Sequence, residues 1–494
     1  MLSFLQNSAY EIIATSIYII NFLIILNLIF REKRSIETIV AWTAVLTTLP
    51  AVGIVMYILV GRGVRKDNMF KIKEQEDKII KKNIAETKAR LKCSSMLDEN
   101  LRDNIDMIDA LTNSNNAHYT NNNSVDIFDK SRDFFDSLLY ELKNAKNYIN
   151  IQFYIFKDDV IGSEIIDILC EKAKSGVEVR LIYDAVGSRL LSEKTLLKLK
   201  KSGVKTGAFF PSLMKIVNFN LNYRNHRKIV VIDGNIAYVG GNNIGDEYLG
   251  KDPKFGEWRD THLKLTGDCI VDLNTRFILD WRYTTQENLD LSKYFTKPQG
   301  SNIYYNKSSN NVGIQIVSSG PDITELDEIK YGYIKMIQKA RKYIYIQTPY
   351  LILDRTLIDS LKIACLSGVD VRIMIPSKPD HPFVYWASCS YAGELLKFGA
   401  KIYTYGENAF LHAKTIVIDD AVCSIGTANM DIRSFELNFE VNAFIYSKEV
   451  SIKQRNIFEK DITNSKQMTI DMYNSRPKLI IIKEAVSRLL SPLL

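Results

Sequence analysis

Residues 145–156 read AKNYINIQFYIF and residues 340–351 read ARKYIYIQTPYL, so one pattern occurs twice in this chain of 494 residues. Each copy is followed by a helical run, a Ser-Gly pair and a second apolar stretch: AKSGVEVRLIYD at 173–184 and CLSGVDVRIMIP at 365–376. The matched positions are Ala145, Tyr148, Gln152 and Gly176 in the first copy and Ala340, Tyr343, Gln347 and Gly368 in the second. The offset is 195 residues at the alanines (340 − 145) and 192 at the glycines (368 − 176), which indicates a duplication.

Each copy is predicted as a strand, a helix that ends at Ser-Gly, and a β-branched strand. That order is the repeating unit of α/β domains. We therefore expect an α/β fold with two domains related by a pseudo-twofold axis, each a mostly parallel sheet covered by helices. An active site shared across the interface of the two domains is the simplest expectation.

A second duplicated element follows further along each copy. Residues 226–233 read HRKIVVID and residues 412–419 read HAKTIVID, which is the pattern His-x-Lys-x4-Asp in both. A glycine and an asparagine follow each aspartate at the same distances. The matched residues are His226, Lys228, Asp233, Gly240 and Asn243, and then His412, Lys414, Asp419, Gly426 and Asn429. Residues two apart on a strand face the same way, so the His and Lys of each copy are expected to project together.

The number of histidines supports a catalytic interpretation of this motif. A single His-x-Lys is uninformative, and an ordinary structural role is the default for one histidine. The chain contains five histidines, His118, His226, His262, His381 and His412, and two of them occupy the matched positions. We interpret those two as catalytic, and His262 and His381, which stand in no ligand cluster, as structural.

Charge is concentrated in one short stretch. The formal net charge is +7, and residues 62–92 carry 11 Lys/Arg against 5 Asp/Glu, a net of +6 (11 − 5). The remainder is close to neutral, whereas a nucleic-acid enzyme more often spreads basic charge over its working face. A basic block beside an apolar segment suits anionic lipid headgroups, so a phospholipid membrane and not nucleic acid is the expected partner.

Two N-terminal segments are long enough to cross a membrane. Residues 12–30 and 38–61 contain no charged residue. As helices they would reach roughly 28 and 36 Å, against about 30 Å for a hydrocarbon core. We predict two transmembrane helices joined by the loop Arg31–Glu37; a buried helical hairpin is the alternative. The longer basic run follows the second helix and favours a cytoplasmic catalytic part, although a hairpin that enters and leaves on one face stays open.

The remaining segments complete the predicted organisation. A charged, helix-prone stretch is followed by the polar run NSNNAHYTNNNS at 113–124, which we interpret as a linker. The predicted divisions are an anchor at 1–65, a juxtamembrane helix and linker at 66–124, a first catalytic domain at 125–305 and a second at 306–494. The C-terminal stretch Lys478–Leu494 would form an amphipathic helix, on the membrane or packed on the core; we favour packing.

Residues 125–494 resemble the phospholipase D superfamily, whose hallmark is the duplicated His-x-Lys-x4-Asp motif. Within it the chain is most similar to bacterial cardiolipin synthases. The similar stretches are AWTAVLTTLPAVGIVMYILVGR (41–62), NYRNHRKIVVIDGNIAYVGGNNIGDEY (222–248), WRDTHLKLTG (258–267), GTANMDIRSFELNFE (426–440) and RLLSPLL (488–494). One departure is DKSRDF at 129–134, which replaces an expected Gly-containing turn far from the motifs in sequence.

The resemblance implies a multi-pass protein of the bacterial plasma membrane that transfers a phosphatidyl group between two phosphatidylglycerol molecules. It implies a phosphohistidine on His226, with His412 as general acid and base, although the reverse assignment stays open. Lys228 and Lys414, with Asn243 and Asn429, can hold the nonbridging phosphate oxygens and balance developing charge. No cofactor or metal is expected, since the lysines supply the positive charge.

Each imidazole needs an acceptor that fixes its tautomer. Glu440, 28 residues after His412, is the candidate on one side, and Asp260 is a weaker candidate on the other. The resemblance implies that Asp233 and Asp419, although part of the catalytic motif, are structural anchors. Neither the preferred acceptor nor the oligomeric state follows from the sequence.

Other activities fit the same two histidines. A hydrolytic phospholipase D would use water as acceptor, and a phosphatidylserine synthase would start from CDP-diacylglycerol. A nuclease is disfavoured by the membrane segments and the nearly neutral catalytic region. A tethered interaction protein with an inactive site is disfavoured because both motifs are intact.

Overall fold

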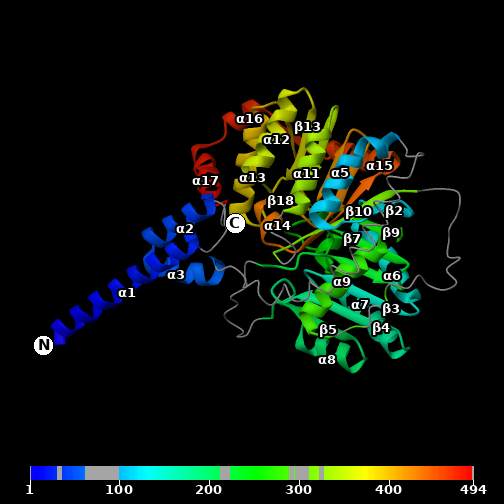
Figure 1. Ribbon diagram of the computed structural model, residues 1–494, viewed down its shortest axis with the longest axis horizontal. Coiled ribbons are helices and arrows are strands. Elements are labelled where there is room, and N and C mark those ends of the chain that lie inside the picture. Colours follow the sequence, from blue (N-terminus) through cyan, green and yellow to red (C-terminus); the bar gives the residue numbers. More distant parts are fainter. Residues whose placement is uncertain are drawn as a thin grey trace.

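The computed structural model describes residues 2–30, 36–61, 99–211, 223–287, 289, 294, 311–321 and 327–491. The predicted loop 31–37, the basic stretch 62–92, the boundary at 305 and the last three residues lie wholly or largely outside this range. Helices α1 (Leu2–Phe30), α2 (Ile36–Thr48) and α3 (Pro50–Met56) form an arm that projects from a larger α/β part, with the N-terminus at its far tip (Figure 1).

The first half of the α/β part contains a seven-stranded sheet in the order β2-β9-β7-β6-β3-β4-β5. Its elements are β2 (Asn123–Phe128), α6 (Ser131–Asn144), β3 (Tyr148–Phe153), α7 (Val160–Lys174), β4 (Glu178–Asp184), α8 (Glu193–Lys201), β5 (Lys205–Phe209), β6 (Ile229–Ile232), β7 (Ile236–Gly240), the 3-10 turn η3 (Asp246–Leu249), β8 (Glu257–Arg259), β9 (His262–Gly267) and α9 (Ile270–Thr285).

The second half repeats this sheet as β10-β19-β17-β16-β11-β13-β14, with β1 and β20 added at the edges. Its elements are β10 (Gly313–Ser319), α11 (Glu328–Lys339), β11 (Tyr343–Gln347), β12 (Leu351–Ile352), α12 (Arg355–Leu366), β13 (Asp370–Pro376), α13 (Pro382–Leu396), β14 (Lys401–Tyr405), β15 (Ala409–Leu411), β16 (Thr415–Ile418), β17 (Val422–Gly426), β18 (Met430–Asp431), α14 (Ile432–Glu436), β19 (Glu440–Tyr446), α15 (Lys448–Thr463), β20 (Ser465–Met468), α16 (Ile470–Asn474) and α17 (Lys478–Leu489). The position-by-position match of the two orders confirms the duplicated α/β fold.

The expectation of mostly parallel sheets was wrong. Only the three strands of each strand–helix–strand series run parallel, β3-β4-β5 and β11-β13-β14, and the other described pairings within the two large sheets are antiparallel. The motif strands β6 and β16 return through short turns into β7 and β17, and a tight hairpin can join only antiparallel strands. The repeated strand–helix–strand pattern predicted the parallel strands correctly. The hairpins that follow the motif strands make the other pairings antiparallel.

Matching cap residues build the matching helices. Asp159 and Asp354 accept hydrogen bonds from the backbone N–H groups of Gly162 and Leu357, at the starts of α7 and α12. An acceptor there satisfies a donor that has no partner inside the helix. Both helices end at the Ser-Gly pairs of the repeat, and Gly176 has φ +94°, in the left-handed region that stops a helix.

The inner faces of the two sheets, together with α9 and α15, share one apolar core. Val231 and Val239 from the first half belong to the same buried cluster as Val417 and Ile425 from the second. Separate cores lie where helices cover the outer face of each sheet. The halves therefore meet through their sheets, and residues at the end of one sheet can reach the other.

Helix α5 (Glu99–Asn115) and strand β1 (Tyr119–Thr120) belong structurally to the second half. Strand β1 pairs with β10, and α5 packs on α11. The polar run at 113–124 is therefore not a free linker. Its Asn123 is buried, donates to the Val312 carbonyl and accepts from the Cys269 N–H, which explains why a polar residue stands there.

The N-terminal arm contains one long helix and one broken segment. Helix α1 (Leu2–Phe30) includes Glu11–Phe30, which is long and apolar enough to cross a membrane and is 11% buried. A core helix of a soluble protein would be mostly buried, so the alternative of a buried hairpin is wrong. The second segment is not one helix, because it divides at Pro50 into α2 (Ile36–Thr48), α3 (Pro50–Met56) and a π-turn (Tyr57–Gly61). Proline has no N–H, and it forces Leu49 out of the helical region.

Candidate active site

The two motif histidines lie where the halves exchange backbone pairing. Asn225 forms a parallel bridge with Phe439, and β15 pairs with β8 so that Leu411 is opposite Arg259. The next residue along the chain is a histidine on one side and a carboxylate on the other. His226 thus lies beside Glu440, and His412 lies beside Asp260.

Each histidine is paired with a carboxylate of the other half. His226 Nδ1 lies 2.9 Å from Glu440 Oε2, and His412 Nδ1 lies 2.7 Å from Asp260 Oδ2. Both carboxylates are fully buried. Because a carboxylate only accepts, it fixes the proton on Nδ1 of each ring and leaves the Nε2 lone pair free. At His412 the donor Lys414 Nζ also lies 2.9 Å from Nδ1, farther away than Asp260. Both carboxylates were candidates from the sequence, and the structure shows which histidine each one contacts.

The lysines lie beside their histidines, just ahead of β6 and β16. Lys228 Nζ donates to the His226 carbonyl at 2.7 Å, and Lys414 Nζ donates to the His412 carbonyl. Burial, opposed by Glu440 and assisted by the charge of Lys414, lowers the pKa of Lys228 to about 7. Burial, opposed by Asp260 and Glu440, lowers the pKa of Lys414 to about 8. Two buried ammonium groups within range of each other form a site for an anion.

The same burial favours neutral imidazoles. Burial lowers the pKa of His226, although Glu440 opposes the shift. Burial and the charge of Lys414, whose Nζ lies 2.9 Å from His412 Nδ1, lower the pKa of His412 to about 4, with Asp260 opposing. A neutral imidazole with a free Nε2 lone pair is a nucleophile. A bound phosphodiester would add negative charge and raise both values.

The motif aspartates lie away from the imidazoles. Asp233 accepts hydrogen bonds from the N–H groups of Lys146, Asn147 and Tyr148, at 2.6 to 2.9 Å. Asp419 accepts from the equivalent N–H groups ahead of β11, those of Arg341, Lys342 and Tyr343. Each aspartate therefore caps the start of the first repeat strand. This geometry is that of an anchor.

The motif asparagines are buried and already hydrogen-bonded. Asn243 Oδ1 accepts from the Ile155 N–H at 3.1 Å, and its amide nitrogen donates to the Tyr248 hydroxyl at 3.2 Å. Asn429 Nδ2 lies 3.3 Å from Asp431, and its Oδ1 has no partner among the described residues. Asn429 is therefore freer to rearrange than Asn243.

The remaining histidines stand apart from this site. His262 is buried and stacked on Phe134, with ring centres 4.0 Å apart, and burial lowers its pKa to about 3. His118 pairs with Asp272, and His381 precedes α13. Within the described part of the chain, no three His, Cys, Asp or Glu side chains are grouped as metal ligands would be.

A known family model matches one segment in each half of the chain. Residues 138–252 and 333–462 match the family model described as cardiolipin synthase, PLD-like domain. Over 490 residues the chain is 46% identical to a major cardiolipin synthase of Bacillus subtilis (strain 168), covering 98% of this chain and 99% of the relative. It is 46% identical over 481 residues to a cardiolipin synthase of Staphylococcus aureus (strain Mu50), covering 97% and 95%. The chain belongs to the cardiolipin synthase family.

Two further comparisons concern the N-terminal segment and the fold. Residues 19–62 match a model described as phospholipase D-nuclease N-terminal, and with the apolar α1 this makes the protein membrane-associated. The crystal structure of a phosphatidylserine synthase from Haemophilus influenzae aligns with a TM-score of 0.58. At 17% identity, over 79% of this chain and 100% of the other, that likeness shows a shared fold.

The sequence missed two residues that support the carboxylates. Thr427 Oγ1 donates to Glu440 at 2.6 Å. The matching position in the first half is Gly241, where a Cβ would come within 1.9 Å of Asp260 Oδ1. The two half-sites thus differ, because Thr427 holds a glutamate where Gly241 makes room for an aspartate. The matched spacing of Gly240-Gly241 and Gly426-Thr427 is a signal that could have identified both.

The sequence also missed two buried ion pairs below the site. Arg227 pairs with Asp280 on α9, and Arg259 pairs with Asp461 on α15, which crosses between the halves. Both carboxylates accept a hydrogen bond from a repeat glutamine. These bonds are Gln152 to Asp280 and Gln347 to Asp461, each 2.7 Å. The glutamines that revealed the duplication therefore hold equivalent carboxylates.

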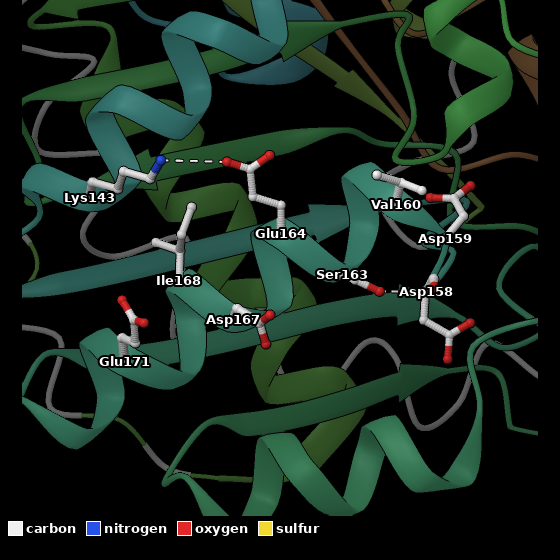
Figure 2. Close-up of a pocket in the computed structure, with 9 residues that line it drawn as sticks. All are labelled: Lys143, Asp158, Asp159, Val160, Ser163, Glu164, Asp167, Ile168 and Glu171. Atoms are coloured by element: carbon white, nitrogen blue, oxygen red, sulfur yellow. Dashed lines mark hydrogen bonds and ion pairs between the residues drawn. The ribbon is translucent and has the colours of Figure 1, made fainter.

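Two other features bear on the site. Ser131, in the departing segment 129–134, donates to Asn242 at 2.7 Å, so that segment lies beside the motif in space although it is distant in sequence. A pocket on α7, shown in Figure 2, is lined mainly by acidic residues: Asp158, Asp159, Glu164, Asp167 and Glu171, with Lys143, Val160, Ser163 and Ile168. It contains none of the motif residues, and its charge opposes an anionic substrate.

Proposed function

We propose that the protein is a cardiolipin synthase that converts two phosphatidylglycerol molecules into cardiolipin and glycerol. The observation that carries the proposal is the pair of half-sites, in which each imidazole is held by a buried carboxylate and accompanied by a buried lysine. The names of the full-length relatives support the same reaction. The site needs no cofactor in this scheme, since two ammonium groups face the phosphate.

In the first step His226 Nε2 attacks the phosphorus of one phosphatidylglycerol. An N–P bond forms, the bond from phosphorus to the glycerol headgroup oxygen breaks, and protonated His412 gives its proton to that oxygen. Lys228 and Lys414 hold the nonbridging oxygens as charge develops. The negative charge of the bound phosphodiester raises the pKa of His412, which favours uptake of a proton from solvent before this step.

In the second step neutral His412 removes the proton from the free primary hydroxyl of another phosphatidylglycerol. That oxygen attacks the phosphorus, the N–P bond breaks, and cardiolipin leaves while His412 is again protonated. The free amide oxygen of Asn429 accepts from the hydroxyl of the second lipid, and the amide nitrogens of Asn429 and Asn243 assist in positioning the phosphate. Asp233 and Asp419 take no part in proton transfer and fix the strands that present the motif.

We propose the division at 1–65, 66–124, 125–305 and 306–494 as an anchor, a connection and two catalytic domains, with α5 and β1 of the connection packed on the second domain. The break at Pro50 leaves α2–α3 folded along α1, where Leu28, Trp42, Leu46 and Tyr57 share a small buried cluster. In our proposal both segments cross the plasma membrane and the catalytic part is cytoplasmic. Protease treatment of sealed right-side-out and inverted vesicles tests this placement through a C-terminal tag, which only inverted vesicles should lose.

The reaction is tested with purified full-length protein in vesicles of phosphatidylglycerol alone. Cardiolipin and free glycerol in equal amounts are expected. Phosphatidic acid as the sole lipid product would indicate a hydrolase, and turnover only with CDP-diacylglycerol would indicate a phosphatidylserine synthase. His226→Ala should abolish labelled phosphohistidine and His412→Ala should still trap some, whereas the reverse pattern exchanges the two roles. His118→Gln is the control for loss of a histidine outside the site.

A further inference from the structure

Helix α17 (Lys478–Leu489) carries its apolar side chains on the side that faces away from the protein. Leu479, Ile482, Val486 and Leu489 lie on one side of the helix at 3.6-residue spacing. They are 62, 59, 46 and 76% exposed. We call these four residues the outer face of α17. A surface helix of a soluble protein has the opposite arrangement.

The side chains of α17 that are fully buried against the protein are polar. Glu484, Ser487 and the following Ser491 are 4, 1 and 5% exposed. Glu484 pairs with Arg476, with closest atoms 2.8 Å apart, and Ser491 Oγ lies 3.2 Å from the Tyr391 hydroxyl on α13. These contacts fix the rotation of the helix, so the outer face cannot turn inward without breaking the ion pair between buried Glu484 and half-buried Arg476. The expected packing on the core is present, and it uses the polar residues.

Two lysines flank the outer face. Lys478 and Lys483 are exposed, and Lys483 Nζ lies 5.3 Å from the Trp386 ring on α13. An apolar stripe bordered by lysines is the pattern of a helix that lies in the plane of a bilayer, with its ammonium groups at the level of anionic headgroups. A second copy of this chain would instead have to cover two sets of lysines.

The position of α17 points the same way. It packs on α13 (Pro382–Leu396), whose first turn exposes Phe383. Asp380, just ahead of that turn, is bonded to Tyr350 and is one of the charges that raise the pKa of Lys414. Figure 1 shows α17 at the same end of the long axis as the arm α1–α3. Helix α17 therefore lies on the side of the α/β part from which the arm projects, and α13 links it to Asp380, whose charge acts on Lys414.

We propose that the outer face of α17 inserts into the interface of an anionic bilayer and holds against it the side of the protein that carries Phe383 and Asp380. Phosphatidylglycerol would then reach the histidines without leaving the membrane surface for water. The proposal rests on the proposed function, because it assumes a bilayer lipid as substrate. It assigns α17 a part in substrate access that the arm alone does not supply.

The test compares two double variants of the full-length protein. Ile482→Ser with Leu489→Ser removes half of the outer face, and Ile363→Ser with Leu366→Ser removes similarly exposed side chains from α12 (63 and 71% exposed). Activity is measured on phosphatidylglycerol vesicles and on monomeric dihexanoyl phosphatidylglycerol. The α17 variant should lose about tenfold or more in kcat/KM on vesicles and little on the monomeric lipid, since less apolar area enters the bilayer. The α12 variant should match the unsubstituted protein on both.

Each other outcome overturns the inference in a distinct way. Equal activity of the two variants on vesicles would show that the outer face does not contact the bilayer. A change of the α17 variant from oligomer to monomer in nanodiscs, with vesicle activity kept, would assign the face to a second copy. Equal loss on vesicles and monomeric lipid would place the effect within the catalytic site. Failure of the unsubstituted protein to transfer with either lipid would refute the proposed function itself.

Discussion

Replacing Glu440 by glutamine should nearly abolish transfer while leaving the protein folded. Glu440 is fully buried and accepts from His226 at 2.9 Å and from Thr427 at 2.6 Å. Glutamine has the same shape, but it can turn its NH₂ group toward the imidazole. His226 would then accept at Nδ1 and carry its proton on Nε2, the atom that must attack phosphorus. Such a wrong tautomer costs a serine protease triad about 10⁴-fold in kcat.

The loss expected here is about 10³- to 10⁴-fold, because Nε2 needs the same lone pair in this site. The assay follows cardiolipin formation from phosphatidylglycerol vesicles, together with trapping of the labelled phosphohistidine, which should fall in parallel. Thr427→Val, which removes a donor to Glu440 but leaves the carboxylate, is the matched control and should cost far less. A fall of less than about tenfold in a folded Glu440→Gln protein would refute the role given to the carboxylate.

Three further predictions follow from the site. Gly241→Ala should lower kcat by about 10²-fold, because the added Cβ would displace Asp260 from His412. The reaction rate at saturating lipid measures kcat, and a near-normal rate would contradict the prediction. Asp461→Ala leaves Arg259 buried without its partner and should cost about 3–5 kcal/mol of unfolding free energy by denaturant titration, while a loss below about 1 kcal/mol would show that the pair is not buried as described. The soluble diester glycerophosphoglycerol, which keeps one negative charge at all these pH values, should raise Tm more at pH 6 than at pH 9. The two motif lysines lose their protons as pH rises through about 7 and 8, so an equal shift at both pH values would remove them from the phosphate site.

Local pattern was enough to identify the chemistry of this protein. The repeated strand and Ser-Gly helix end depend on neighbouring residues alone, and so does the His-x-Lys-x4-Asp spacing. They predicted the duplication, the α/β class and the two candidate histidines, whereas the anchoring role of Asp233 and Asp419 was implied by the family resemblance. An uncharged run of the length of residues 12–30 likewise indicates a membrane helix from composition alone.

Tertiary structure decided what depends on residues distant in the chain. The sequence offered Glu440 and Asp260 as acceptors, but the pairing of Asn225 with Phe439 and of β15 with β8 decided which histidine each one holds. The antiparallel hairpins, the break at Pro50 and the attachment of α5 to the second half were not predicted.

The two HxK motifs can be recognised from short stretches of sequence, because their spacing involves only residues that are close together in the chain. The site itself is not local. His226 and Glu440 are 214 residues apart, and only the packing of one sheet on the other brings them within hydrogen-bond distance. The same holds for α17. Its amphipathic period is visible in the sequence, but which side faces the protein depends on the burial of Glu484 and its ion pair with Arg476.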